Sequence, residues 1–243
     1  YVLKGGLDFN QLESIFKQIL ASMSNSKLTS LRGQQINLIS LLIEHHEEAV
    51  IQELVNSKSL NLLDNIINCT NEEGYRNIVL SLNTLNILVS KLRPFSSDVM
   101  GFDDSGNVIM SSAQPEEATN STIENCKLIY SAISPHFEAH DADQEIKKSA
   151  IDAMSSLFYY MGDLNMENEL LTILKVLENR IENEITRVSA LRAITRLSSS
   201  PIKIQLSKLN RTCLQNMAEY SRQQSREVRM TCMQALNAFI TSI

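Results

Sequence analysis

Apolar residues recur along this chain at spacings of three and four, which places them on one side of an α-helix. One apolar template, in which small residues are followed by larger ones, occurs three times at intervals of 40 and 42 residues. The copies are Ala150-x-x-Ala153-Met154-x-x-Leu157, Ala190-x-x-Ala193-Ile194-x-x-Leu197 and Cys232-x-x-Ala235-Leu236-x-x-Phe239. A repeat of this length made of helices alone predicts a stack of similar helical hairpins.

The length of the repeat also favours one fold class. Repeats of about 40 residues built from helix pairs are typical of HEAT and armadillo solenoids. We therefore expect an all-α right-handed superhelix of about five helical hairpins, with the second helix of each pair lining the concave side. We interpret residues 1–243 as a single HEAT-repeat array and as a fragment of a longer solenoid, since no polar capping repeat is apparent at either end.

The same spacing defines the individual helices, and turn-forming residues separate them. The expected helices cover residues 8–23, 30–45, 47–56, 59–68, 72–92, 121–134, 143–161, 166–179, 183–198, 204–220 and 225–241. Pro94, Gly162-Asp163 and the run 198–201 mark the clearest breaks between them.

A basic residue stands three positions before the first small residue in each copy of the template: Lys147, Arg187 and Arg229. Arg32 and Arg76 occupy comparable places near the starts of two upstream helices. Because a buried or half-buried arginine is usually paired, we expect the three template residues to pair with acidic residues of the adjacent repeat as an interior ladder. Contact with a ligand is the alternative for these residues.

Residues 94–118 interrupt the helical pattern. They include two prolines, two glycines and five acidic residues, with no basic residue and no sustained apolar period. Such a segment buries too little apolar surface to offset the entropy of ordering. We expect an inserted acidic loop, most mobile over 96–117, within one hairpin of the array.

The composition suits stacked helices better than other classes. Only 7 glycines and 4 prolines occur among 243 residues, too few for the many turns of a sandwich or barrel. None of the four cysteines forms a CxxC pair, so neither a zinc ribbon nor a redox motif is indicated. With no secretory signal, no disulfide framework and no apolar stretch of membrane-spanning length, we expect an intracellular protein of the cytoplasm, the nucleus or both.

The net charge of −6 is unevenly distributed. Residues 1–182 carry 13 basic and 25 acidic side chains, whereas residues 183–243 carry 9 basic and 3 acidic ones. Uneven solvated faces would explain this difference. Two surfaces that face different partners, or different parts of one partner, are the alternative explanation.

Several segments resemble one known family in the same order along the chain. They are Leu88-Val-Ser-Lys-Leu-Arg-Pro94, Asp141-Ala-Asp-Gln-Glu-Ile-Lys-Lys-Ser-Ala-Ile-Asp-Ala-Met154, Glu182-Asn-Glu-Ile-Thr-Arg187 and Ser199-Ser-Pro-Ile-Lys-Ile204. The chain is similar here to the central repeats of the cullin-associated, neddylation-dissociated family. The resemblance covers mainly 141–206 and 73–97, and the loop 94–118 is longer than in that family.

The resemblance implies a function. Members of that family are HEAT-repeat solenoids that wrap around unmodified cullin–RING scaffolds and promote exchange of their substrate-receptor modules. It implies a cullin–RING partner for this chain and no nucleic acid, membrane or small-molecule substrate. A different HEAT-repeat adaptor, such as a nuclear transport receptor or a phosphatase scaffold, is the alternative. Partner contact would use exposed charges beside the apolar stripe, for which Lys148, Arg192 and Arg226 are the candidates.

Candidate chemistry is sparse. His136 and His140 have the spacing of two metal ligands on one helical face, but Pro135 precedes them and the stretch resembles a turn. The two adjacent histidines at 45–46 fit a polar helix end, where the helix dipole favours cations. Gly5-Gly6 lacks the strand that a phosphate-binding loop requires. We therefore expect no catalytic residue, no cofactor and no metal site.

Overall fold

The computed structural model describes residues 7–25, 29–72, 74–95, 101–102, 108–109, 116–202, 204, 206–209 and 211–242. These residues form eleven α-helices, one short 3-10 helix and two short strands. The helices are α1 (Phe9–Asn25), α2 (Thr29–His45), α3 (Glu48–Asn56), α4 (Leu62–Thr70), α5 (Tyr75–Leu92), α6 (Asn120–Glu138), α7 (Gln144–Met161), α8 (Glu167–Glu182), α9 (Arg187–Ser198), α10 (Arg211–Tyr220) and α11 (Arg226–Ser242), with the 3-10 turn η1 at Leu206–Lys208.

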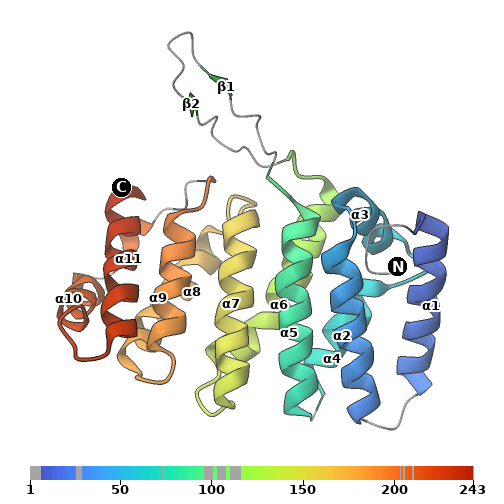
Figure 1. Cartoon of the computed structure of the whole chain (residues 1–243), viewed down its shortest axis with the longest axis horizontal. Coiled ribbons are helices and arrows are strands. Elements are labelled where there is room, and N and C mark those ends of the chain that lie inside the picture. The colour runs from blue at the N-terminus through green and yellow to red at the C-terminus, as the bar shows by residue number, and fades with distance from the viewer. Residues whose placement is uncertain are drawn as a thin grey trace.

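The helices form two layers. Helices α2, α5, α7, α9 and α11 stand side by side in one layer and run in the same direction (Figure 1). Helices α4, α6, α8 and α10 lie behind them, each packed against the second helix of its own pair. Together with α1 and α3 this gives five hairpins, and the expected helical solenoid is confirmed.

The two layers differ in how closely their helices approach one another. Helices α2, α5, α7, α9 and α11 pack directly against their neighbours along the stack, whereas α4, α6, α8 and α10 make few contacts with one another. Closer spacing in one layer is what the concave side of a curved stack requires. We call α2, α5, α7, α9 and α11 the inner layer and the remaining helices the outer layer.

Small residues permit this close approach. The first small residue of each template copy, at 150, 190 and 232, is fully buried. In α2 the same role falls to Gly33, where a Cβ atom would lie 2.9 Å from Oδ1 of Asn77 in α5. At Gly33 the absence of a side chain therefore allows α2 and α5 to approach closely.

Several helix ends differ from the sequence-based expectation. The largest difference is in the expected helix 204–220, where the α-helix begins only at Arg211 and the 3-10 turn η1 precedes it. Two further differences have a visible cause. Helix α6 continues past Pro135 to Glu138, because Phe137 is buried and anchors the last turn in the core. Helix α9 begins at Arg187 rather than near 183, because the side chain of Asn183 accepts a hydrogen bond from the amide of Ile185 (3.0 Å) and holds a turn.

The insertion contains one small antiparallel pair. Strands β1 (Gly101–Phe102) and β2 (Val108–Ile109) pair in the register Gly101 with Ile109 and Phe102 with Val108. They lie past the end of α5, away from both layers (Figure 1). The predicted mobility of 96–117 concerns a segment most of which lies outside the described residues.

The four cysteines are free and buried. Burial raises the pKa of the Cys69, Cys126 and Cys213 thiols to about 12, so these groups stay protonated at neutral pH. This confirms the cysteines as small core residues. No helix in the described part of the chain is long and apolar enough to cross a membrane.

Candidate partner-binding surface

The three template basic residues share one structural role. Each donates hydrogen bonds to main-chain carbonyls just before its own helix. Arg187 reaches the carbonyls of Ile181 (2.9 Å) and Glu182 (3.0 Å), and Arg229 reaches those of Gln223 (2.8 Å) and Gln224 (2.6 Å). The Lys147 ammonium donates to the carbonyl of His140. They therefore fasten the turn between the two helices of one hairpin.

The expected interior ladder was wrong for Lys147, Arg187 and Arg229. None of these side chains makes an ion pair with an acidic residue of the adjacent repeat in the described structure. The carbonyls at a helix C-terminus have no partner within the helix, so a nearby cation is drawn to them instead. Arg187 also lies over the ring of Tyr220, with 4.1 Å from its guanidinium carbon to the ring centre.

Other basic residues do connect adjacent hairpins. The side chain of Arg32 pairs with Glu72 at 2.6 Å across the α2–α5 contact. Lys91 bonds both the carboxylate of Glu48 and the carbonyl of His46, each at 3.0 Å. Sequence reasoning identified none of these pairings, although Lys91 lies in the last turn of its helix, where a cation is favoured.

Arg180 and Arg196 make similar bridges to carbonyl groups. The buried guanidinium of Arg180 donates to the carbonyls of Phe137 (2.9 Å) and Ala139 (2.6 Å) at the end of α6. Burial lowers the pKa of this guanidinium. One terminal nitrogen of Arg196 donates to the carbonyl of Asp152 and to the hydroxyls of two serines in α7, Ser155 and Ser156. Each arginine thus ties one helix pair to the pair before it.

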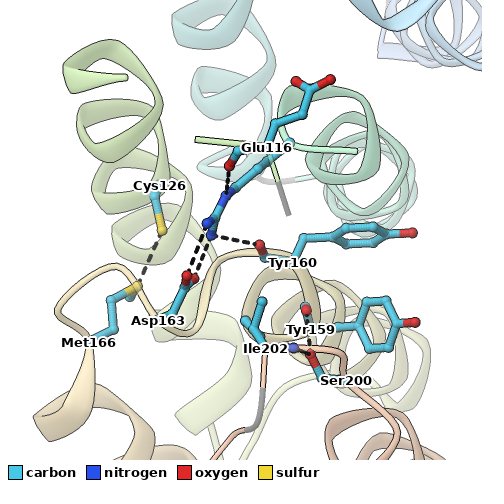
Figure 2. Close-up of polar contacts among 9 residues, drawn as sticks. Glu116, Cys126, Tyr159, Tyr160, Asp163, Met166, Ser200 and Ile202 are labelled. Atoms are coloured by element: carbon cyan, nitrogen blue, oxygen red, sulfur yellow. Dashed lines mark hydrogen bonds and ion pairs between the residues drawn. The ribbon is translucent and has the colours of Figure 1, made fainter. Parts of the chain in front are cut away.

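Arg93 fixes the base of the insertion to the next hairpin. Its guanidinium holds both carboxylate oxygens of Asp163 at 2.5 and 2.9 Å and donates to the carbonyls of Glu116 (2.9 Å) and Tyr160 (3.2 Å) (Figure 2). Next to it, Phe95 stacks on the ring of Tyr160, with ring centres 5.1 Å apart. Both ends of the insertion are therefore held at the end of α7.

The candidate contact residues lie on three consecutive inner-layer helices. Lys148 is exposed on α7, Arg192 on α9 and Arg226 at the start of α11. Arg192 pairs with Glu227 of α11 at 2.9 Å, with both side chains more than 60% exposed. Lys148 and Arg226 have no polar partner for their side chains among the described residues.

A shallow groove of about 640 Å³ crosses α2, α5, α7 and α9 on the inner layer. The side chains that characterise it are Glu44, Asn86, Tyr159, Tyr160, Arg192 and Arg196. The rings of Tyr159 and Tyr160 point to the same side of α7 (Figure 2). Of the three predicted contact residues, only Arg192 lines this groove.

The histidines form no metal site. His136 lies in the last turn of α6, whereas His140 lies beyond its end, so the two imidazoles do not share a helical face. Burial lowers the pKa of His136, and a hydrogen bond to the backbone of Thr70 offsets this only in part. Within the described ranges no three His, Cys, Asp or Glu side chains gather as metal ligands would.

The pair at the end of α2 behaves as expected for a polar helix terminus. His45 and His46 bond the carbonyls of Leu41 and Leu42 at 3.0 and 2.7 Å through their Nδ1 atoms. Both bonds hold the imidazoles at the carbonyl end of the helix.

Comparison with protein families gives one match over more than half of the chain. A family model described as CAND1-like with TPR repeats matches residues 9–154. Its range includes residues 73–97 and the start of 141–206, the two segments that carry the sequence resemblance to the family. TPR units, like HEAT units, are pairs of helices.

Curated relatives extend the match along the chain. Cullin-associated NEDD8-dissociated protein 1 of Dictyostelium discoideum is 25% identical over 240 residues, which cover 98% of this chain and 17% of the relative. The protein of the same name from Arabidopsis thaliana is 26% identical over 217 residues, 89% of this chain and 16% of the relative. The protein of that name from Drosophila melanogaster is 29% identical over 112 residues, 46% of this chain and 9% of the relative. The chain spans less than a fifth of the length of each of these proteins.

Solved structures with the same arrangement are designed armadillo repeat proteins. One of these, in complex with the peptide (KR)4, has a TM-score of 0.65 and 16% identity and covers 98% of this chain and 88% of its own. Another, computationally designed for modular peptide recognition, has a TM-score of 0.59 and 15% identity with the same coverage. At this identity the likeness establishes the fold alone.

Proposed function

The chain belongs to the CAND1-like family, and from this premise we propose that it forms part of a non-enzymatic scaffold that binds unmodified cullin and promotes exchange of substrate-receptor modules in cullin–RING ubiquitin ligases. The family match over 9–154 is the observation that carries the proposal. The relatives are named for association with cullin and dissociation of NEDD8, and two of them align with nearly the whole chain.

The geometry supports binding by a long surface. The inner layer continues through five hairpins, and its exposed charges lie on successive helices. A solenoid of this kind distributes many modest contacts over a large area, so that no single residue has to dominate the affinity. We propose that Lys148, Arg192 and Arg226 lie within the contact area.

The proposal is tested with the 243-residue chain and the full-length protein, each immobilised separately. Purified cullin–RING complexes are offered in unmodified and NEDD8-modified forms, and retention is quantified. We expect the full-length protein to retain the unmodified complex strongly and the modified complex weakly. The 243-residue chain should retain the unmodified complex more weakly than the full-length protein, because it offers only part of the surface.

Two results would contradict the proposal. One is equal retention of both cullin forms by the full-length protein. The other is a small GTPase or a phosphatase subunit as the main partner captured from lysate, which would support a different HEAT-repeat adaptor. Retention by the full-length protein without any by the chain would place the binding outside these five hairpins.

A further inference from the structure

The groove across α2, α5, α7 and α9 is lined by Arg196, whose guanidinium is held in place through only one of its nitrogens. One terminal nitrogen of Arg196 is held by Ser155, Ser156 and the carbonyl of Asp152 at 2.7–3.0 Å. The other N–H groups of this guanidinium have no acceptor among the described residues and border the groove. A guanidinium that is already oriented loses little rotamer entropy when it binds a carboxylate.

Arg192, one turn earlier on α9, is the second cation of the groove. Its partner Glu227 lies on α11, outside the groove lining, and both side chains are largely exposed. Exposed pairs of this kind contribute little to stability, so an incoming carboxylate can compete with Glu227 for Arg192. No acidic residue occurs between Glu184 and Glu219, so every charged residue of α9 is basic.

An aromatic surface and a set of neutral polar groups adjoin these arginines. The rings of Tyr159 and Tyr160 lie 4.9 Å apart, with Phe95 packed against both. Hydroxyl and amide side chains, among them Asn86, line the helices on either side. Neutral donors and acceptors suit the main chain of an extended peptide, and the tyrosines suit one of its apolar side chains.

One acidic residue lines the groove and two lie beside it, and their positions bear on the choice of ligand. Glu44 lies at the α2 end, Lys91 is paired with Glu48, and the Asp152 carboxyl lies near both arginines. A polyphosphate chain would meet these carboxylates along its length, and nucleic-acid binding relies on many phosphate contacts. A peptide that places one or two carboxylates at the α9 end avoids Glu44 and Glu48 and lies near Asp152 alone.

We propose that this groove binds an extended acidic segment of a partner polypeptide, with its carboxylates on Arg192 and Arg196 and an apolar side chain on Tyr159 and Tyr160. The proposal identifies a type of partner segment for the inner layer and rests on the scaffold function to that extent. Its test uses no cullin, so the two proposals can fail separately.

The test measures binding of short fluorescein-labelled peptides to the 243-residue chain by fluorescence anisotropy. The probe alternates glutamate and valine, and the control peptide of equal length alternates lysine and valine. A labelled single-stranded oligonucleotide is the third probe. We expect the chain to bind the glutamate peptide and neither of the others at the same concentration.

Matched variants locate the binding. Arg192→Gln should weaken binding about tenfold, the loss expected for one hydrogen bond to a charged group. Arg222→Gln removes an equal charge from the exposed turn between α10 and α11 and should leave binding within about twofold, since it contacts no groove residue. Asn86→Ala should weaken binding a few-fold, whereas Asn83→Ala, one turn earlier on α5 and outside the groove lining, should not.

Three outcomes would overturn the proposal. Equal losses in Arg192→Gln and Arg222→Gln would show diffuse charge attraction. Tighter binding of the oligonucleotide would indicate a nucleic-acid surface, and equal binding of the lysine peptide would remove the charge argument. If the circular dichroism spectrum shows that Arg192→Gln is unfolded, the test rests on the other pair of variants. Equal binding by Asn86→Ala and Asn83→Ala would then overturn the proposal.

Discussion

At the scale of single residues, two kinds of position carry most of the structural information. Small residues such as Ala193 are buried in the core, and basic residues such as Arg180 reach across to carbonyl groups of the preceding hairpin. The first kind follows a local apolar period. The second depends on which main-chain carbonyls the fold brings within reach.

Ala193 offers a test of the first kind. Its side chain is only 1% exposed, so Ala193→Asp would bury an unpaired carboxylate and should reduce the free energy of unfolding by about 2 to 5 kcal/mol. Thermal unfolding followed by circular dichroism measures the loss. Ala218→Asp on the exposed face of α10 is the control and should change stability by less than about 0.5 kcal/mol. An unchanged melting temperature for Ala193→Asp would mean that this face of α9 is not packed as described.

At the scale of elements, α5, α7 and α9 each pack against an inner-layer helix on both sides, whereas α11 packs against α9 alone in the described part of this layer. Ile151 of α7 and Leu191 of α9 occupy equivalent positions in the repeat and are fully buried. The equivalent Met233 of α11 is 58% exposed, as are its neighbours Met230 and Ile240 at 50% and 65%. In the described part of the chain no helix covers this side of α11, although its residues suit stacking.

The equivalent positions therefore predict opposite responses to the same change. Leu191→Glu should lower the free energy of unfolding by about 2 to 5 kcal/mol, because it places a charge between α9 and α11. Met233→Glu should shift it by no more than about 0.5 kcal/mol, since the new side chain stays in water. Urea unfolding midpoints compare the two variants. A similar loss for Met233→Glu would show that this side of α11 is covered.

At the scale of the whole molecule, charge is segregated along the stack. The acidic excess lies in residues 1–182, and the basic excess lies in 183–243, which include α9 and α11. Of the candidate contact residues, Arg192 and Arg226 lie in the basic part, and Lys148 lies in the acidic part on α7, which packs against α9. Exposed charges of this kind set association rates and their salt dependence more than final affinity.

Reversing Lys148, Arg192 and Arg226 together to glutamate in the full-length protein should slow cullin capture about tenfold at low ionic strength. The effect should shrink at physiological salt, where the screening length is about 8 Å. Stopped-flow or surface binding kinetics measure the association rate. A triple reversal of Lys175, Arg211 and Arg222, which are exposed outside the inner layer, changes the net charge equally and serves as control. If the first triple variant and the parent protein associate at equal rates, these hairpins act only as a spacer, and the repeats that bind cullin lie elsewhere in the full-length protein.

The sequence alone determined the helical solenoid, its repeat register and the burial of the template residues. A helical period depends on residues three and four apart, and the same period repeats about every 40 residues, so both can be recognised without coordinates. The helix end at Glu138 was missed, because Pro135 suggested a stop and the burial of Phe137 is a tertiary contact.

Only the tertiary structure decided the partners of the basic residues and the existence of the groove. Every residue has a carbonyl, so the sequence does not reveal which ones Lys147, Arg187 or Arg180 will reach. That choice depends on where helix ends meet between hairpins some 40 residues apart. The groove likewise collects side chains from four helices, and no local spacing relates Glu44 to Arg196. Periodicity is a property of neighbouring residues, whereas a binding surface depends on how separate elements pack.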